Sequence, residues 1–222
     1  MSAARPLRIA IAGFGPFPGV AKNPSAEIVR QLLRMQRFRN SGIRLSGAIF
    51  PTAYEAAEKE LLTLLKSGPD AVVLFGVAGR RREVCIETTA RNAVSVLAPD
   101  NARFVPAKRA LMEKGSRTLP LRAPARRLLQ AAKSAGVRAR LSRDAGSYLC
   151  NASFYRALHE TRAQEKPPLV VFIHIPMPRA NRPPRRPRRR LRRLPALLPL
   201  FSALVRAAAA ILAASISAAR RR

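Results

Sequence analysis

Short apolar runs separated by amphipathic segments are the feature that most constrains the fold of this chain. The clearest run, at residues 70–77 (DAVVLFGV), is apolar almost throughout and does not alternate with polar residues. Such continuity is typical of a strand that is covered on both faces in a largely parallel sheet. Further strands are predicted at residues 7–14, 43–50, 137–141 and 169–175, and a strand pair or an extended segment at residues 84–96.

The amphipathic segments between these runs predict helices. One begins near Asn23, a good N-cap residue, with Pro24 at the first helical position and Ile28 and Leu32 on one face. Other helices are predicted over residues 55–66, 123–134 and 148–162. Strands that alternate with helices predict an α/β fold with three layers, in which helices flank a central sheet.

Composition agrees with a folded domain, because 48% of the 222 residues are apolar and only 24% are charged. Disorder throughout the chain is therefore excluded. Two cysteines cannot form a disulfide framework, and the first residues lack the apolar stretch of a secretory signal. We expect one domain over residues 1–222, in the reducing cytoplasm.

The net charge of +30 is extreme, and much of it lies near the C-terminus. Thirteen arginines and no acidic residue follow Pro176, and nine of these arginines lie among prolines in the segment Arg179 to Arg193. We expect residues 177–195 to be a basic Arg/Pro-rich loop with an extended, solvated backbone. The charge also admits binding of nucleic acid, although the absence of Trp and an aromatic content of 5% disfavour a base-stacking surface.

The apolar segment at residues 194–219 is long enough to be considered as a membrane span. Pro195, Pro199 and Arg206 disfavour this reading, since an arginine at the bilayer centre costs about 2.5–3.5 kcal/mol. On a helical wheel, Arg206 lies opposite an apolar face. We therefore predict that residues 196–219 form a helix that docks on a soluble domain, and we expect no association with a membrane. The apolar face contains Phe201, Leu204, Val205, Ala208, Ile211 and Leu212.

Two cysteines are the candidate thiol nucleophiles. Cys150 follows a turn at residues 144–146 and begins a helical pattern, and the partial positive charge at a helix N-terminus stabilises a thiolate. The alternative for Cys150 is a small buried hydrophobic residue. Cys85 lies in an extended segment without a glycine turn or helix start, so we expect it to be an inert buried thiol.

Only one of the two histidines is placed to act as a base for Cys150. His159 lies nine residues later on the same predicted helix, which puts it roughly 13 Å away. His174 ends an apolar run, and strand ends in open α/β sheets face the ligand crevice. Glu87 is the best carboxylate to orient the imidazole. The alternative for His174 is a hydrogen-bonded histidine in the core. The alternative for Glu87 is a side chain of an edge strand that points into water.

Two glycine-containing segments fit a substrate site. Residues 13–19 (GFGPFPG) place Phe14 and Phe17 on a rigid loop, where they suit a small, flat apolar group. Residues 76–80 (GVAGR) end the central strand with backbone that can approach a ligand closely. Neither segment is a phosphate-binding loop.

Four motifs in register give the chain a resemblance to a known family. GFGPFPG followed by AKNPSAEIV, then GVAGRRREVCIETTARNAV, then DAGSYLCN, and finally FIHIP together resemble the pyroglutamyl peptidase family of cysteine peptidases, over about residues 7 to 176. The resemblance implies an α/β sandwich with a twisted, largely parallel central sheet, a cytoplasmic homotetramer, and no metal or cofactor. It implies Cys150 as the nucleophile, His174 as the base and Glu87 as the acidic member.

The implied reaction removes an N-terminal 5-oxoproline from a peptide through a thioester acyl-enzyme. The implied substrate-binding residues are Phe14, Phe17, Tyr148 and Asn23. Family members often carry other residues at three positions, with Gln in place of Val77, Gly in place of Arg80 and Arg in place of Leu97.

Two further hypotheses come from the basic charge. In the first, the chain is a catalytically weak homologue whose basic surface binds nucleic acid or another polyanion. In the second, the chain is active and the loop at Arg179 to Arg193 has a role in assembly.

Overall fold

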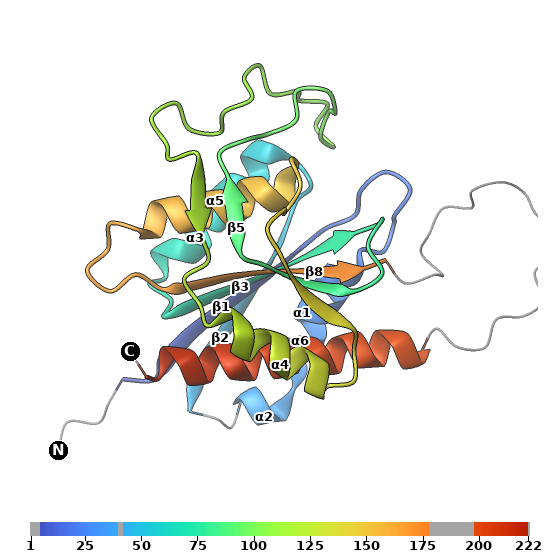
Figure 1. Ribbon diagram of the computed structural model, residues 1–222, viewed down its shortest axis with the longest axis vertical. Helices are drawn as coiled ribbons and strands as arrows, with labels where there is room; N and C mark the ends of the chain where they lie inside the picture. Colours follow the sequence, from blue (N-terminus) through green and yellow to red (C-terminus); the bar gives the residue numbers. More distant parts are fainter. Residues whose placement is uncertain (1–4, 40–41, 178–197, 222) are drawn as a thin grey trace, which may run out of the picture.

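A six-stranded central sheet organises the computed structural model, which describes residues 5–39, 42–177 and 198–221 (Figure 1). The strands lie in the order β2-β1-β3-β8-β4-β7. Strands β2, β1, β3 and β8 are mutually parallel, whereas β4 pairs antiparallel with β8 and parallel with β7. The predicted α/β fold with a largely parallel sheet is thus confirmed. The strands are β1 (Leu7–Phe14), β2 (Ile43–Phe50), β3 (Ala71–Ala78), β4 (Val84–Glu87), β7 (Ala139–Ser142) and β8 (Leu169–Pro176).

Helices cover both faces of this sheet, which gives the three predicted layers (Figure 1). Helices α1, α4 and α6 pack on one face, and α3 and α5 pack on the other. The helices are α1 (Pro24–Arg34), α2 (Gln36–Arg39), α3 (Tyr54–Lys66), α4 (Ala125–Ser134), α5 (Leu149–Thr161) and α6 (Leu198–Ala219).

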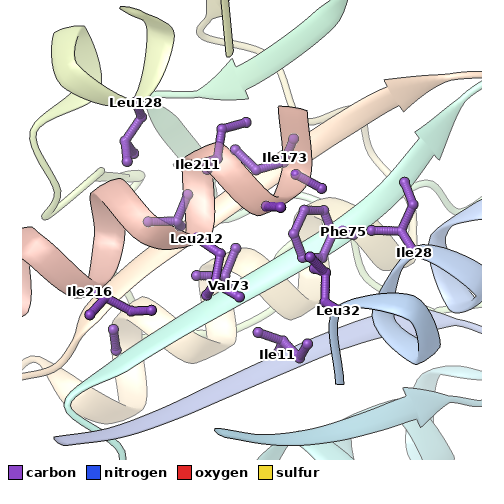
Figure 2. Packing of buried hydrophobic residues seen from close by; sticks show 14 of the residues in the cluster. Ile11, Ile28, Leu32, Val73, Phe75, Leu128, Ile173, Ile211, Leu212 and Ile216 are labelled. Atoms are coloured by element: carbon purple, nitrogen blue, oxygen red, sulfur yellow. The ribbon is translucent and has the colours of Figure 1, made fainter. Parts of the chain in front are cut away.

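Strand β3 shows how the sheet serves two cores. Val72 and Leu74 point to the face covered by α3 and α5, while Val73 and Phe75 point to the face covered by α1 and α6, and all four are fully buried. This alternation follows from the two-residue period of a strand. Figure 2 shows the second set packed against side chains of α1 and α6. Because both faces of β3 are covered by helices, its sequence is apolar almost throughout, as predicted.

Helix α6 lies against α4 and α1 and buries Ile211, Leu212 and Ile216 in the core (Figure 2). Arg206 is exposed, as the helical wheel predicts. Ser215 interrupts the apolar face and is buried, but its hydroxyl donates to the carbonyl of Ile211 at 2.9 Å. Within the described ranges, no helix has the length and apolarity needed to cross a membrane.

Several parts of the sequence prediction lie outside the described residues. They include Arg179 to Arg193 and all but the first residue of the predicted loop at 177–195. The side chains of Phe201, Leu204 and Val205, which belong to the predicted docking face, lie outside them as well.

The segment at residues 84–96, predicted as a strand pair or an extended segment, forms two strands that belong to different sheets. Its first part is β4 in the central sheet, and its second part, β5 (Thr89–Arg91), pairs antiparallel with β6 (Thr118–Pro120) in a separate two-stranded sheet. Neither β6 nor the short helix α2 is predicted from the sequence. The pairing of β5 with β6 joins Thr89 to Pro120. These residues are far apart in the sequence, so no local pattern predicts the contact.

Candidate active site

Strands β4 and β8 bring Glu87 and His174 into contact. Nδ1 of His174 lies 2.7 Å from Oε1 of Glu87, and both side chains are almost completely buried. The ring of His174 also packs on the ring of Phe172, with 4.9 Å between the centroids. Contact with the carboxylate and the phenyl ring fixes the orientation of the imidazole, and it leaves Nε2 as the ring nitrogen available to another group.

Cys150 lies at the start of α5, as predicted. The preceding turn contains Gly146 at φ 84°, a backbone conformation that favours glycine. Tyr148 occupies the N-cap position, and its side chain forms no capping hydrogen bond. The first backbone N–H groups of α5 have no carbonyl partner within the helix, so they are available to an anionic group beside Cys150.

The structure brings the Cys150 thiol close enough to His174 for the two side chains to interact electrostatically. Gly76 on β3 leaves the space that Sγ of Cys150 occupies. A Cβ atom added to Gly76 would lie 2.8 Å from this sulfur and 2.9 Å from the ring of Phe172. The close approach of strand and thiol explains why the sequence has glycine here.

Opposing effects act on the charge of His174. Burial disfavours the imidazolium, but interactions with Cys150 and then with Glu87 favour it, and the pKa of His174 is raised to about 9. Protonated His174 is therefore the prevailing form at neutral pH. In general, an imidazolium beside a cysteine favours the thiolate form of the thiol.

Arg81 completes this cluster, although the sequence did not single it out from the neighbouring arginines. Its guanidinium forms an ion pair with Oε1 of Glu87 and donates a second hydrogen bond to the carbonyl of Asp144. Burial disfavours the charge of Arg81, but attraction to Glu87 outweighs this effect and raises the pKa of Arg81.

Asn151 holds the start of α5 against the segment that follows β5. Its Oδ1 accepts from the backbone N–H of Arg91 at 2.9 Å, and its Nδ2 donates to the carbonyls of Arg91 and Ala93 at 2.8 and 2.7 Å. The guanidinium of Arg91 in turn contacts Asp144 and the carbonyl of Gly146. The loop before Cys150 is thereby fixed from two sides. Only the position of Asn151, directly after Cys150, hinted at this role.

Of the residues predicted to bind substrate, Phe17 and Tyr148 are partly exposed, whereas Phe14 is buried. The ring of Phe14 packs on Phe50 and Phe172 at centroid distances of 5.8 and 6.4 Å. Tyr148 donates from its hydroxyl to the carbonyl of Pro99 at 3.1 Å.

Asn23 is 6% exposed, and its side chain is engaged within the chain. Oδ1 accepts from the N–H and the hydroxyl of Ser25 at 3.0 and 2.8 Å, and Nδ2 donates to the carbonyl of Gly15 at 2.8 Å. The predicted N-cap role of Asn23 is confirmed. Its contacts tie the loop at residues 13–19 to α1.

Tyr54, at the start of α3, is a neighbour of the site that the sequence did not reveal. Its ring packs edge-on against Tyr148, with 5.5 Å between the centroids. Burial, and then the nearby Tyr148, Asp100 and Cys150, raise the pKa of Tyr54. Its hydroxyl is buried, and the described part of the chain offers it no hydrogen-bond partner.

The remaining candidates lie where a local reading of the sequence places them. Cys85 is fully buried, and its thiol contacts the carbonyl of Glu83 at 3.6 Å. His159 stacks on Tyr155 further along α5, with 5.9 Å between the ring centroids. Val77 is partly exposed and Leu97 is 86% exposed. Among residues 5–39, 42–177 and 198–221, no group of three or more His, Cys, Asp or Glu is placed to hold a metal ion.

Comparison with known proteins gives the family of this chain. The family model of pyroglutamyl peptidase matches residues 7–181. Pyrrolidone-carboxylate peptidases of Yersinia pestis and Yersinia pseudotuberculosis are 33% identical over 170 residues, which are 76% of this chain and 78% of each relative.

Solved structures show the same fold. Pyrrolidone carboxyl peptidase from Thermococcus litoralis matches with a TM-score of 0.77 and 25% identity, over 93% of this chain and 94% of that one. A mutant pyrrolidone carboxyl peptidase from Pyrococcus furiosus matches with a TM-score of 0.79 and 20% identity, over 95% and 99% of the two chains.

The fold and the family match identify the chain as a hydrolase with an α/β fold. The chain belongs to the pyroglutamyl peptidase family. This membership supports a pyroglutamyl peptidase activity.

Proposed function

We propose that this chain is a cysteine exopeptidase that hydrolyses the bond after an N-terminal pyroglutamyl residue, through a thioester on Cys150. One observation carries the proposal: His174 is hydrogen-bonded to Glu87 and interacts electrostatically with Cys150 at the start of α5. A thiol, an imidazole and a carboxylate in this order form the arrangement in which a base activates a nucleophile and an acid orients the base.

In the first half of the reaction, the Cys150 thiolate attacks the pyroglutamyl carbonyl carbon and forms a tetrahedral intermediate. The carbon–nitrogen bond then breaks, and His174 gives its proton to the leaving amine. A thioester remains on Cys150. In the second half, His174 takes a proton from water and the resulting hydroxide attacks the thioester carbonyl carbon. The carbon–sulfur bond then breaks, free pyroglutamic acid leaves, and the Cys150 thiolate and protonated His174 are restored. Glu87 holds the imidazole and stabilises its charged form.

The negative oxygen of each tetrahedral intermediate needs hydrogen-bond donors. The N–H groups of the first turn of α5 supply them, because no side chain caps this end of the helix. Asn151, which lies in this turn, is anchored to the backbone of residues 91 and 93. The anchor keeps the donors in place without reorganisation during the reaction.

The flat lactam ring of the substrate would lie between the side chains of Phe17 and Tyr148, which are both partly exposed. Phe14 supports this region from the core through its contact with Phe172. Asn23 contributes by fixing the loop at residues 13–19 through its bond to Gly15. These residues therefore differ in their proposed roles, since Phe17 and Tyr148 are partly exposed and would contact the ring, whereas Phe14 and Asn23 are buried and would support them.

We also propose the setting in which the enzyme works. It is a single domain over residues 1–222 that needs neither metal nor cofactor, acts on peptides in the reducing cytoplasm, and assembles as a homotetramer. Sedimentation of the purified chain tests the tetramer. Deleting Arg179 to Arg193 and repeating the measurement tests whether that loop has a role in assembly.

The activity is tested by the release of a fluorophore from a pyroglutamyl amide. We expect turnover by the wild type, loss of at least a thousandfold in Cys150→Ser on the scale known for nucleophile removal, and near-normal turnover in the matched control Cys85→Ser. Normal turnover in Cys150→Ser would refute the assignment of the nucleophile, and an inactive wild type would refute the proposed activity.

A further inference from the structure

Contacts of the Arg81 guanidinium with Glu87 and with Asp144 join parts of the site that come from different elements. Nη1 binds Oε1 of Glu87 on β4, and Nη2 binds the backbone carbonyl of Asp144 in the loop between β7 and α5. The side chain of Arg81 is 19% exposed, whereas that of Glu87 is fully buried. The planar fork of an arginine suits such a double contact, which a lysine cannot reproduce.

Each contact leads to one half of the catalytic pair. Glu87 holds His174 through the same oxygen, Oε1, that receives Arg81. Asp144 begins the turn that leads to Cys150, and its side chain accepts from the N–H of Gly146 at 3.0 Å. Arg81 therefore lies between the residue that orients the base and the loop that presents the nucleophile.

The charge of Arg81 acts on His174 through Glu87. Oε2 of Glu87 has no hydrogen-bond partner among the described residues, so the negative charge of the buried carboxylate is shared between Arg81 and His174. A nearby cation reduces the attraction that the imidazolium receives from Glu87. The other groups around this cluster are Cys85 on β4, Cys150 on α5, Tyr54 at the start of α3, and Tyr148 and Asp100 beside Cys150.

We propose that Arg81 is a positioning residue with two separable effects: its contact with Asp144 holds the nucleophile loop, and its charge limits how strongly Glu87 retains the proton of His174. The inference rests on the proposed function only for its consequence in catalysis. The contacts and the charge effect concern the protein whether or not pyroglutamyl peptides are its substrates.

A direct test is NMR titration of the His174 ring in a Cys150→Ser background, which needs no turnover. Arg81→Gln and Arg81→Met both remove the charge, and the amide of Gln retains hydrogen-bonding capacity that favours folding. Arg82→Gln is the matched control, because Arg82 is the exposed neighbour. We expect the titration of His174 to move upward by about one pH unit in the neutral variants, with Arg82→Gln unchanged and Arg81→Lys close to the control.

Kinetics of the same Arg81 and Arg82 variants with Cys150 intact separate the two effects. We expect Arg81→Lys to lose about tenfold in kcat with an unshifted alkaline limb, since it keeps the charge and loses the second contact of the fork. In Arg81→Gln the alkaline limb of kcat/KM should rise along with the titration. A His174 titration in Arg81→Gln that equals the Arg82→Gln control would overturn the proposal. An inactive wild type with a shifted titration would instead refute only the proposed function.

Discussion

Glu87 and His174 lie 87 positions apart in the chain, yet Oε1 of the first and Nδ1 of the second are 2.7 Å apart. Strand β4 makes this contact possible because it runs antiparallel beside β8, with Glu87 opposite Phe172 and Cys85 opposite His174. Because β4 runs antiparallel to β8, the C-terminal end of β4 places Glu87 beside the side chain of His174 on β8. The site is thus built by the sheet order and not by a local motif.

Glu87→Gln should move the alkaline limb of kcat/KM downward. The carboxylate helps to raise the pKa of His174, so an amide in its place removes a favourable charge while it keeps the shape. We expect kcat to fall by about 10²-fold, which is typical for the loss of an acid–base contribution. Steady-state kinetics from pH 5 to pH 10 measure both effects. Glu83→Gln, four residues before Glu87 in the chain, is the control. An unshifted alkaline limb in Glu87→Gln would contradict the role of the carboxylate.

His174 should contribute stability at low pH that disappears as the pH rises. Its pKa is raised from 6.5 to about 9 in the folded chain, so the contribution is complete below about pH 6.5 and is lost as the pH approaches 9. The loss is on the order of 1 kcal/mol per pH unit at most, since one pKa unit corresponds to about 1.4 kcal/mol. Urea unfolding of the wild type and of His174→Gln should show a difference that shrinks over this range, and a constant difference would be inconsistent with the raised pKa.

Gly76→Ala should lower activity strongly, because the new Cβ would lie 2.8 Å from the sulfur of Cys150. The contact forces the thiol or the strand to move, and a displacement of this kind costs on the order of 10²-fold in rate. Gly79→Ala is the matched control, since a Cβ there meets nothing within 4 Å. Fluorogenic turnover and thermal unfolding compare the two variants. Equal turnover in both would mean that the position of the thiol does not matter.

Asn151→Ala should destabilise the fold by about 2–4 kcal/mol. The substitution removes the side-chain partner of three partly buried backbone groups, and because they are only partly buried each costs about 1 kcal/mol, the low end of the range for an unsatisfied group. Gln130→Ala on the exposed face of α4 removes an amide without such contacts and serves as the control. Denaturant unfolding reports both free energies. A cost below that of the control would show that Asn151 does not anchor the start of α5.

Most of the strands and helices were predictable because their apolar residues follow a local pattern. Cys150 and His174 were singled out for a similar reason, since a helix start and a strand end are visible in the sequence, and their catalytic roles stay a proposal. Arg81 and Phe172 were missed because their importance comes from contacts with Glu87, Asp144 and His174 that no spacing encodes. The prediction of polyanion binding is untouched by any described contact and stays a prediction.

Asn23 shows that a sequence predicts a local structural role more readily than a contact with a substrate. The sequence offered it both as an N-cap and as a substrate-binding residue, and the structure uses both of its side-chain atoms for the cap and for the carbonyl of Gly15. The capping role follows from one helix start, whereas contact with a substrate depends on how loops far apart in the chain meet.

The thioester on Cys150 is tested by mass spectrometry of the enzyme quenched in acid during turnover of a pyroglutamyl peptide. We expect one pyroglutamyl group on the fragment that contains Cys150, and no such group when proline replaces the pyroglutamyl residue of the peptide. Turnover that leaves Cys150 unmodified, or a pyroglutamyl group found on Cys85, would contradict it.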